Sequence, residues 1–267
     1  MPAGVGFILG IRSRTTECAV YISASSRCFA DQSFDEACRQ IVDLEYDKID
    51  IWVDEETDHL KPSEVIANPD QFAFQFRDKC RLSPVAFTLA HDIEASVMRG
   101  LCETCKAMRI TQINVPAGQL GTPFNSEIDR LKEFVSIANE YGVRIGLQTK
   151  TGHLTEDPHT AVELCQSVRG LGLSLDPSYY ICGPHRNQSW DQVFPYVFHM
   201  SLRDTSETEV QVQVGLGEMD YARLIQCLKR EDYSRALSVD FDPSLMKDLS
   251  IRPLEMRKLR LLLETLL

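Results

Sequence analysis

The sequence has no run of basic residues and no apolar stretch of the length that spans a membrane. Its 39 acidic residues outnumber the 28 basic ones, and the formal net charge of −11 repels a nucleic-acid backbone. The apolar segment VGFILGI near the N-terminus is too short for a span and lacks the flanks of a signal peptide. We therefore predict a cytoplasmic protein that binds neither nucleic acid nor membranes.

The cysteines fit neither a disulfide framework nor a zinc site. The nine cysteines are an odd number scattered through a long chain, which is typical of reduced thiols. The C-x-x-C motif formed by Cys102 and Cys105 has no second pair, and it lies in a stretch with the periodicity of a helix. We interpret the motif as one face of a helix.

Apolar runs of strand length alternate with amphipathic runs of helix length, as expected of βα units around a parallel sheet. The predicted strands begin at Cys18, Lys48, Pro84, Ile110, Val143, Leu171, Val197 and Ala236. Eight such units in 267 residues are typical of a (β/α)8 TIM barrel of the α/β class. A doubly wound open sheet is the alternative, but no glycine-rich turn follows a strand to hold a phosphate or a dinucleotide.

Helix start and stop signals lie between the predicted strands. Ser33 and Glu36 form a capping box, Asn125 is a candidate N-cap of a helix that stops at Gly142, and Pro158 opens another helix. Because we find no repeat, linker or low-complexity tract, we predict one domain, residues 18–267. We assign residues 1–17 to an N-terminal extension or a cap on the bottom of the barrel.

The active site of a TIM barrel lies at the C-terminal ends of the strands, so the last polar residues of each strand are candidates for function. A tryptophan there could hold the apolar face of a sugar, and a histidine could contact a substrate at the mouth. The candidates are Asp50, Trp52, His91, Asp92, Asn114, Gln148, Lys150, Asp176, Tyr179, Ser201, Arg203 and Asp240.

Four segments in the second half of the chain resemble those of a known family. They are LQTKTGHLTEDP, LGLSLDPSYYICG, HMSLRD with the later VGLGEMDYARLIQCL, and YSRALSVDFDP. In their order and spacing they resemble strand ends of the xylose isomerase-like TIM barrels, which include sugar isomerases, sugar epimerases and metal-dependent apurinic endonucleases. The resemblance implies a barrel that acts on or binds a sugar, a polyol or a related hydroxy-carbonyl compound.

The resemblance also implies a metal site, to which four strand ends of the family contribute a Glu, an Asp, a His and a Glu. These positions fall on Gln148, Asp176, Ser201 and Asp240, and only Asp176 is unchanged. Gln148 cannot act as a base, Asp240 is shorter than Glu, and Ser201 replaces imidazole poorly. We therefore expect altered or lost metal-dependent activity and no cofactor. The alternative is Mg²⁺ or Mn²⁺ bound weakly by Asp176, Asp240 and the Gln148 carbonyl.

Lys150 stands where the family has a histidine and shares a strand face with Gln148. Its ammonium could reach Asp176 and Asp240 and replace the lost cation, or it could lie in solvent. It could also form a Schiff base with a carbonyl substrate. We thus predict Asp176, Asp240 and Lys150 as catalytic groups. The predicted substrate contacts are Gln148, Tyr179, Trp52, His91, Ser201 and Arg203.

His199 precedes Ser201 by two residues on one strand face, one layer deeper in the barrel. We interpret it as a buried polar side chain of the barrel interior rather than as a relocated ligand. The glycines of the GLGEMD turn after this strand are expected to serve backbone conformation.

Two alternatives to a sugar isomerase or epimerase follow from the same pattern. One is a non-catalytic sugar-binding or regulatory barrel that has lost the reaction. The other, an apurinic endonuclease, needs a multi-metal site with several histidines and a basic groove, and the sequence provides neither. In the first two cases the partner is a small metabolite, and a homo-oligomer is compatible with such barrels.

Overall fold

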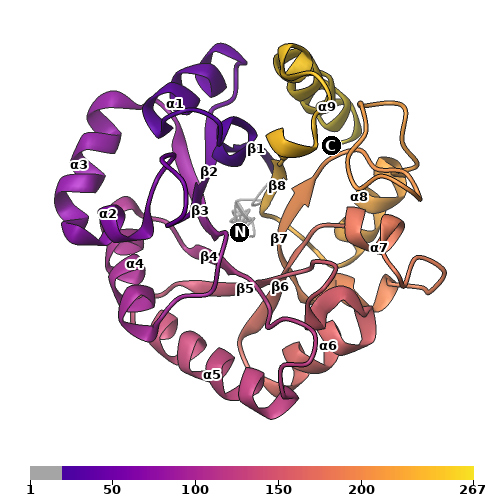
Figure 1. Ribbon diagram of the computed structural model, residues 1–267, viewed down its shortest axis with the longest axis horizontal. Coiled ribbons are helices and arrows are strands. Elements are labelled where there is room, and N and C mark those ends of the chain that lie inside the picture. Colours follow the sequence, from indigo (N-terminus) through magenta and orange to yellow (C-terminus); the bar gives the residue numbers. More distant parts are fainter. Residues whose placement is uncertain (1–19) are drawn as a thin grey trace, which may run out of the picture.

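The computed structural model describes residues 20–267, and the extension predicted for residues 1–17 lies outside this range. Eight parallel strands pair in sequence order, and β8 closes on β1 to complete a barrel (Figure 1). This is the predicted (β/α)8 fold of the α/β class. The strands are β1 (Tyr21–Ser25), β2 (Lys48–Val53), β3 (Ser83–Leu89), β4 (Gln112–Val115), β5 (Arg144–Gln148), β6 (Leu171–Leu175), β7 (Val197–Leu202) and β8 (Ala236–Val239).

Helices surround the barrel and cover its outer face (Figure 1). They are α1 (Phe34–Asp43), α2 (Pro62–Ala67), α3 (Pro69–Lys79), α4 (Ala95–Met108), α5 (Phe124–Glu140), α6 (Pro158–Ser167), α7 (Ser178–Cys182), α8 (Tyr221–Arg230) and α9 (Arg252–Leu266). Short 3-10 turns are η1 (Ser26–Phe29), η2 (Leu154–Glu156), η3 (Asp191–Tyr196), η4 (Pro243–Leu245) and η5 (Leu249–Ile251).

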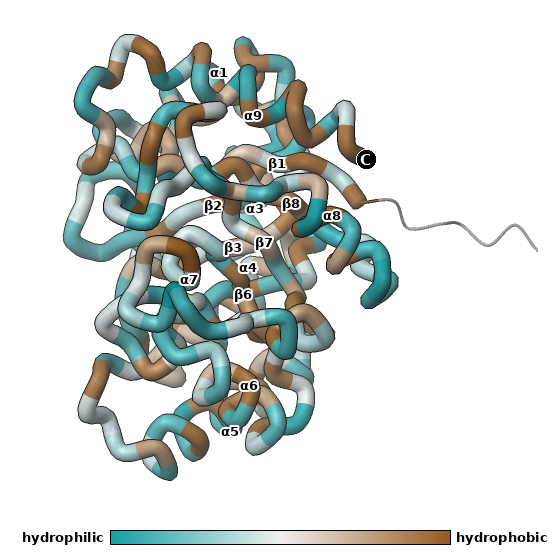
Figure 2. The backbone as a smooth tube through the Cα atoms, turned by 90° about the vertical axis from the view of Figure 1, so that its right-hand side faces the viewer, coloured by the Kyte–Doolittle hydropathy of each residue, from teal (hydrophilic) through white to brown (hydrophobic). Residues whose placement is uncertain are grey.

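The outer helices are amphipathic because one face of each packs on the strands. Figure 2 shows hydrophobic and hydrophilic segments alternating along them. In α4 the buried face includes Cys102 and Cys105, both fully buried, so the C-x-x-C motif is one helix face as predicted. Within residues 20–267, no helix combines the length and the apolar character needed to cross a bilayer.

The predicted helix signals hold in part. The Ser33 half of the capping box is formed, whereas the Glu36 carboxylate accepts from Arg39 and Gln40. The Ser33 hydroxyl accepts a hydrogen bond from the backbone N–H of Glu36, and Pro158 opens α6. Asn125 is not an N-cap, because α5 begins at Phe124 and the cap position is Pro123. Proline fits there because its fixed φ, here −59°, suits the extended cap conformation and its missing N–H costs the helix no hydrogen bond.

The barrel interior contains a polar network below the strand ends. His199 of β7 is 2% exposed, and its Nε2 lies 3.0 Å from Asp50 Oδ2. Thr88 Oγ1 donates to Asp50 Oδ1 at 2.7 Å and accepts from Asn114 Nδ2 at 2.9 Å. His199 is therefore a hydrogen-bonded side chain of the barrel interior, as its spacing from Ser201 predicts.

Candidate functional site

A pocket of about 200 Å³ opens at the C-terminal ends of the strands. The strands converge at this end, so residues far apart in the sequence meet in it. Every residue predicted as catalytic or substrate-binding lines the pocket. These residues are Trp52, His91, Gln148, Lys150, Asp176, Tyr179, Ser201, Arg203 and Asp240.

Three other strand-end candidates lie outside the pocket. Asp50 and Asn114 belong to the hydrogen-bonded network inside the barrel. The Asp92 carboxylate accepts a hydrogen bond of 2.6 Å from Arg130 Nη1. Choosing the last polar residues of each strand therefore identifies the pocket. This choice does not separate residues that line the pocket from residues that lie outside it.

The centre of the pocket is an ion-pair cluster around Arg203, which directly follows β7 and is 1% exposed. Its Nη2 donates to Asp176 Oδ2 at 2.6 Å and lies 3.4 Å from Asp240 Oδ2. The other Asp176 oxygen accepts from the backbone N–H of Ser178 at 3.0 Å and from the Ser178 hydroxyl. One guanidinium thus contacts both Asp176 and Asp240.

The electrostatics of the cluster favour the charged form of Arg203. Burial lowers the pKa of the guanidinium, but attraction from Asp176, Tyr179 and Asp240 outweighs burial and raises this pKa above its usual value. Nε and Nη1 of Arg203 and Oδ1 of Asp240 are buried and have no hydrogen-bond partner within residues 20–267. The hydrogen-bonding capacity of the cluster is therefore not exhausted.

Arg27, in the η1 turn after β1, is a second cation of the cluster. Its Nη1 lies 3.5 Å from Asp240 Oδ2, and its Nη2 lies 2.5 Å from Asp242 Oδ2. Sequence reasoning missed Arg27 because it ended the first strand at Ser23, whereas β1 continues to Ser25. With the correct strand end, the rule for TIM barrels would have selected this arginine.

Lys150 lines the pocket, but its side chain is exposed and makes no hydrogen bond or ion pair in the part of the chain that the structure describes. The pKa of its amine is lowered, first by desolvation and then by repulsion from Arg27, with Asp242 opposing the shift. The contact with both carboxylates that the sequence suggested for Lys150 is made by Arg203 instead.

Polar and aromatic side chains form the walls. Gln148 Nε2 donates to the backbone oxygens of Leu89 at 2.7 Å and Asn114 at 3.3 Å, which fixes the side-chain amide. The ring of Tyr179 lies 5.8 Å from the Arg203 guanidinium carbon, and burial raises the pKa of the Tyr179 hydroxyl. The phenol therefore stays protonated and can donate a hydrogen bond.

The loop that follows Arg203 is held by the next residue, Asp204. Its carboxylate accepts from the backbone N–H groups of Thr205 at 3.0 Å, Gly215 at 2.7 Å and Gly217 at 3.2 Å. Gly215 has φ +91°, and a Cβ on Gly217 would lie 2.1 Å from Asp204 Oδ1. Both glycines serve backbone conformation, as predicted.

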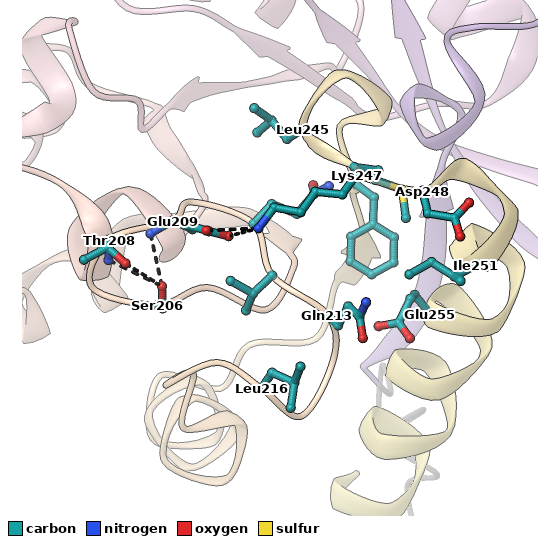
Figure 3. Close-up of a pocket in the computed structure, with 14 residues that line it drawn as sticks. Ser206, Thr208, Glu209, Gln213, Leu216, Leu245, Lys247, Asp248, Ile251 and Glu255 are labelled. Carbon is teal, nitrogen blue, oxygen red and sulfur yellow. Dashed lines mark hydrogen bonds and ion pairs between the residues drawn. The ribbon is translucent and has the colours of Figure 1, made fainter.

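A second cavity, of about 350 Å³, lies between the loop after β7 and the segment after β8 (Figure 3). Phe241 and Ile251 form part of its apolar wall, and Lys247 pairs with Glu209 at 3.2 Å on its rim. Its one deeply buried acid, Glu255, is already bonded to Lys258 at 2.8 Å. Among the residues that line these two cavities, the buried charged groups with unsatisfied atoms are Arg203 and Asp240 of the strand-end pocket, which we therefore take as the functional site.

Comparison with known proteins agrees with the barrel fold. The sequence profile of the xylose isomerase-like TIM barrel family matches residues 39–260, so the chain belongs to that family. A search of curated proteins finds no match.

Solved structures share the fold at low sequence identity. A xylose isomerase-like TIM barrel protein from Mycobacterium smegmatis, in complex with magnesium, has a TM-score of 0.71 and 16% identity, covering 92% of this chain and 97% of that one. The probable 3-DHS dehydratase AsbF from Bacillus anthracis has a TM-score of 0.68 and 16% identity, with coverage of 89% and 98%. D-allulose 3-epimerase from Methylomonas sp., in complex with D-allulose, has a TM-score of 0.66 and 13% identity, with coverage of 91% and 97%.

Proposed function

We propose that the strand-end pocket binds a sugar or a related hydroxy-carbonyl compound without a divalent metal ion, and that Arg203 supplies the positive charge at its centre. The observation that carries this proposal is the contact of Arg203 Nη2 with Asp176 at 2.6 Å and Asp240 at 3.4 Å. The ligand class is supported by the structural relatives, which include an L-ribulose 3-epimerase and the D-allulose complex.

The residues at the family's ligand positions fit a divalent metal poorly. Ser201 and Gln148 replace the nitrogen ligand and one carboxylate. The two remaining carboxylates already share a guanidinium. This unit charge and a divalent cation about 4 Å away would repel by about 8 kcal/mol at an effective dielectric constant of about 20. No group of three or more His, Cys, Asp or Glu side chains suited to a metal occurs within residues 20–267. We assign no step of any reaction to a metal.

The pocket walls offer what a sugar-like ligand needs. Tyr179 can donate a hydrogen bond, the Gln148 carbonyl can accept one, and the Ser201 hydroxyl can do either. Trp52, which lines the pocket, offers an aromatic face for the C–H groups of a sugar. The volume of about 200 Å³ is below the roughly 300–1,000 Å³ of sites for drug-sized ligands, which favours a small compound.

Calorimetric titration of D-allulose and other ketoses into the protein, with excess EDTA present, tests this proposal. We expect saturable binding that survives chelation. Tyr179→Phe should weaken binding roughly two- to twelvefold, because one hydrogen bond contributes about 0.5–1.5 kcal/mol. Tyr196→Phe is the matched control, since the Tyr196 hydroxyl bonds Gln166 outside the pocket. Binding that disappears with EDTA, or no binding of any hydroxy-carbonyl compound, would contradict the proposal.

A second candidate function is covalent catalysis by Lys150, favoured by the lowered pKa of its amine and its lack of an ion pair within residues 20–267. A neutral amine can attack a ketose carbonyl; the C–N bond forms, and the carbonyl oxygen leaves as water to give a Schiff base. Reduction with borohydride in the presence of ketose should then leave a stable adduct that Lys150→Arg lacks. An unmodified chain that still binds ketose would leave binding alone as the function.

A further inference from the structure

Two cysteines from distant parts of the chain meet outside the barrel, between α1 and α3. Cys38 lies in α1, and Cys80 directly follows α3. Both side chains line a surface groove of about 370 Å³, where the Cys38 thiol is placed to donate to the Cys80 sulfur. Cys38 is 6% exposed and Cys80 is partly buried, so a small reagent in the groove meets Cys80 first.

The surroundings favour a thiolate on Cys80. The hydrogen bond from Cys38 lowers the pKa of the Cys80 thiol to about 7; the backbone N–H of Leu82 also lowers it, whereas burial and Asp35 oppose the shift. The same contact raises the pKa of Cys38, which therefore keeps its proton while Cys80 loses one. Lys79 adds a nearby cation, although its ammonium is 2.8 Å from Asp35 Oδ2.

Three buried cysteines elsewhere in the described residues lie in environments that suppress reactivity. Burial raises the pKa of Cys28, Cys102 and Cys165 to about 12, so these thiols stay protonated near neutral pH. Since the thiolate is the nucleophile, they are expected to react slowly.

We propose that Cys38 and Cys80 form a redox-active thiol pair that hydrogen peroxide oxidises to an intramolecular disulfide. The Cys80 thiolate attacks one peroxide oxygen, the O–O bond breaks, and hydroxide leaves and is protonated to water. Cys38 then loses its proton, and its sulfur attacks the sulfenic sulfur of Cys80. The S–S bond forms as the S–O bond breaks, releasing a second water. The two thiols together lose two electrons, which the peroxide accepts.

The disulfide would join α1 to the segment between α3 and β3. A dithiol such as dithiothreitol would reverse it by exchange, regenerating both thiols. The proposal does not depend on what the strand-end pocket binds, because the groove is lined by residues of α1, α3 and the turn after α3.

Peptide mapping of peroxide-treated protein is the first test. After alkylation and digestion, we expect a cross-linked peptide containing Cys38 and Cys80, a loss of two titratable thiols per chain, and recovery of both with dithiothreitol. Cys38→Ser should instead accumulate a sulfenic acid on Cys80 that dimedone traps. Cys102→Ser is the matched control because it removes a buried thiol and keeps the pair. Cys18→Ser controls for the cysteine outside the described residues.

Alkylation kinetics supply a second, independent readout. At a pH of about 7, iodoacetamide should modify Cys80 about three- to fourfold faster in the wild-type chain than in Cys38→Ala. Alanine has no donor, so the pKa of the Cys80 thiol returns toward about 8.5; the thiolate fraction then falls about sixteenfold, and the greater nucleophilicity of the more basic thiolate offsets part of that loss. Equal rates in the two proteins, or a folded wild-type chain that keeps both thiols free after peroxide, would overturn the proposal.

Discussion

Arg203 brings a permanent positive charge to the strand ends, where it contacts both Asp176 and Asp240. Its guanidinium stays protonated at any working pH and presents a planar array of donors that matches carboxylates. The sequence identified Asp176, Asp240 and Arg203 as neighbours at strand ends, yet it favoured Lys150 as the cation between the carboxylates. The choice depends on which side chain turns inward, and strand spacing fixes only the face on which each residue lies.

Removing the Arg203 guanidinium should destabilise the protein strongly. We expect Arg203→Met to lower the free energy of unfolding by about 3–5 kcal/mol, because Asp176 would remain buried without a cationic partner and Asp240 would keep only Arg27, at 3.5 Å. Arg203→Lys should lower the free energy of unfolding less, since lysine keeps the positive charge and loses only the planar array of donors. Urea denaturation near neutral pH measures both losses.

A surface arginine provides the control for this prediction. Arg39 pairs with Glu36 on the outside of α1 and is 68% exposed, so Arg39→Met should change the free energy of unfolding little. If Arg203→Met behaved like Arg39→Met, the buried cluster would not be a stabilising feature of the protein.

Strands and helices were predicted well, whereas some of their ends were not. Buried strands carry continuous apolar runs, and the amphipathic runs between them mark helices, so all eight strands were found in order. The first strand was placed too early, because the apolar run starting at Cys18 continues to Ile22 and the small polar residues that follow gave no strand signal. Because of this error, Arg27 was not among the candidate site residues predicted from the sequence.

The loop after β7 depends on close approach of Gly217 to Asp204. We expect Gly217→Ala to lower the free energy of unfolding by about 1–3 kcal/mol, because its Cβ would lie 2.1 Å from Asp204 Oδ1 and 2.5 Å from the Thr205 backbone oxygen. The same substitution should weaken ketose binding, since the loop begins next to Arg203. Denaturation and calorimetry measure the two effects.

Gly121→Ala is the control for Gly217→Ala, because it replaces a glycine by alanine without a steric clash. Gly121 has φ +91° and open space around it, so alanine there costs only backbone strain, about 1 kcal/mol. A Gly217→Ala variant that is as stable as wild type and binds ketose equally well would show that the close contact between Gly217 and Asp204 does not hold the loop.

The whole molecule has the closed barrel of its family, with a buried cluster of Arg203, Asp176 and Asp240 at the strand ends. Length and the repeated βα pattern predicted the closed barrel, and convergence of the strand ends predicted which residues share a pocket. Ion-pair partners could not be read from the sequence in the same way. They depend on side-chain depth and on burial, which lowers the local dielectric and makes each buried charge require a partner.

Titration of Mn²⁺ into metal-free protein, by calorimetry and by melting, tests most directly whether Arg203 has taken the place of the metal. We predict no saturable binding at the pocket and no change in Tm with Mn²⁺. A metal bound only by the folded state would stabilise it by about 2.7 kcal/mol at about 100 times its Kd, which melting detects readily. Stoichiometric Mn²⁺ binding that Asp176→Ala abolishes would contradict the central role of Arg203.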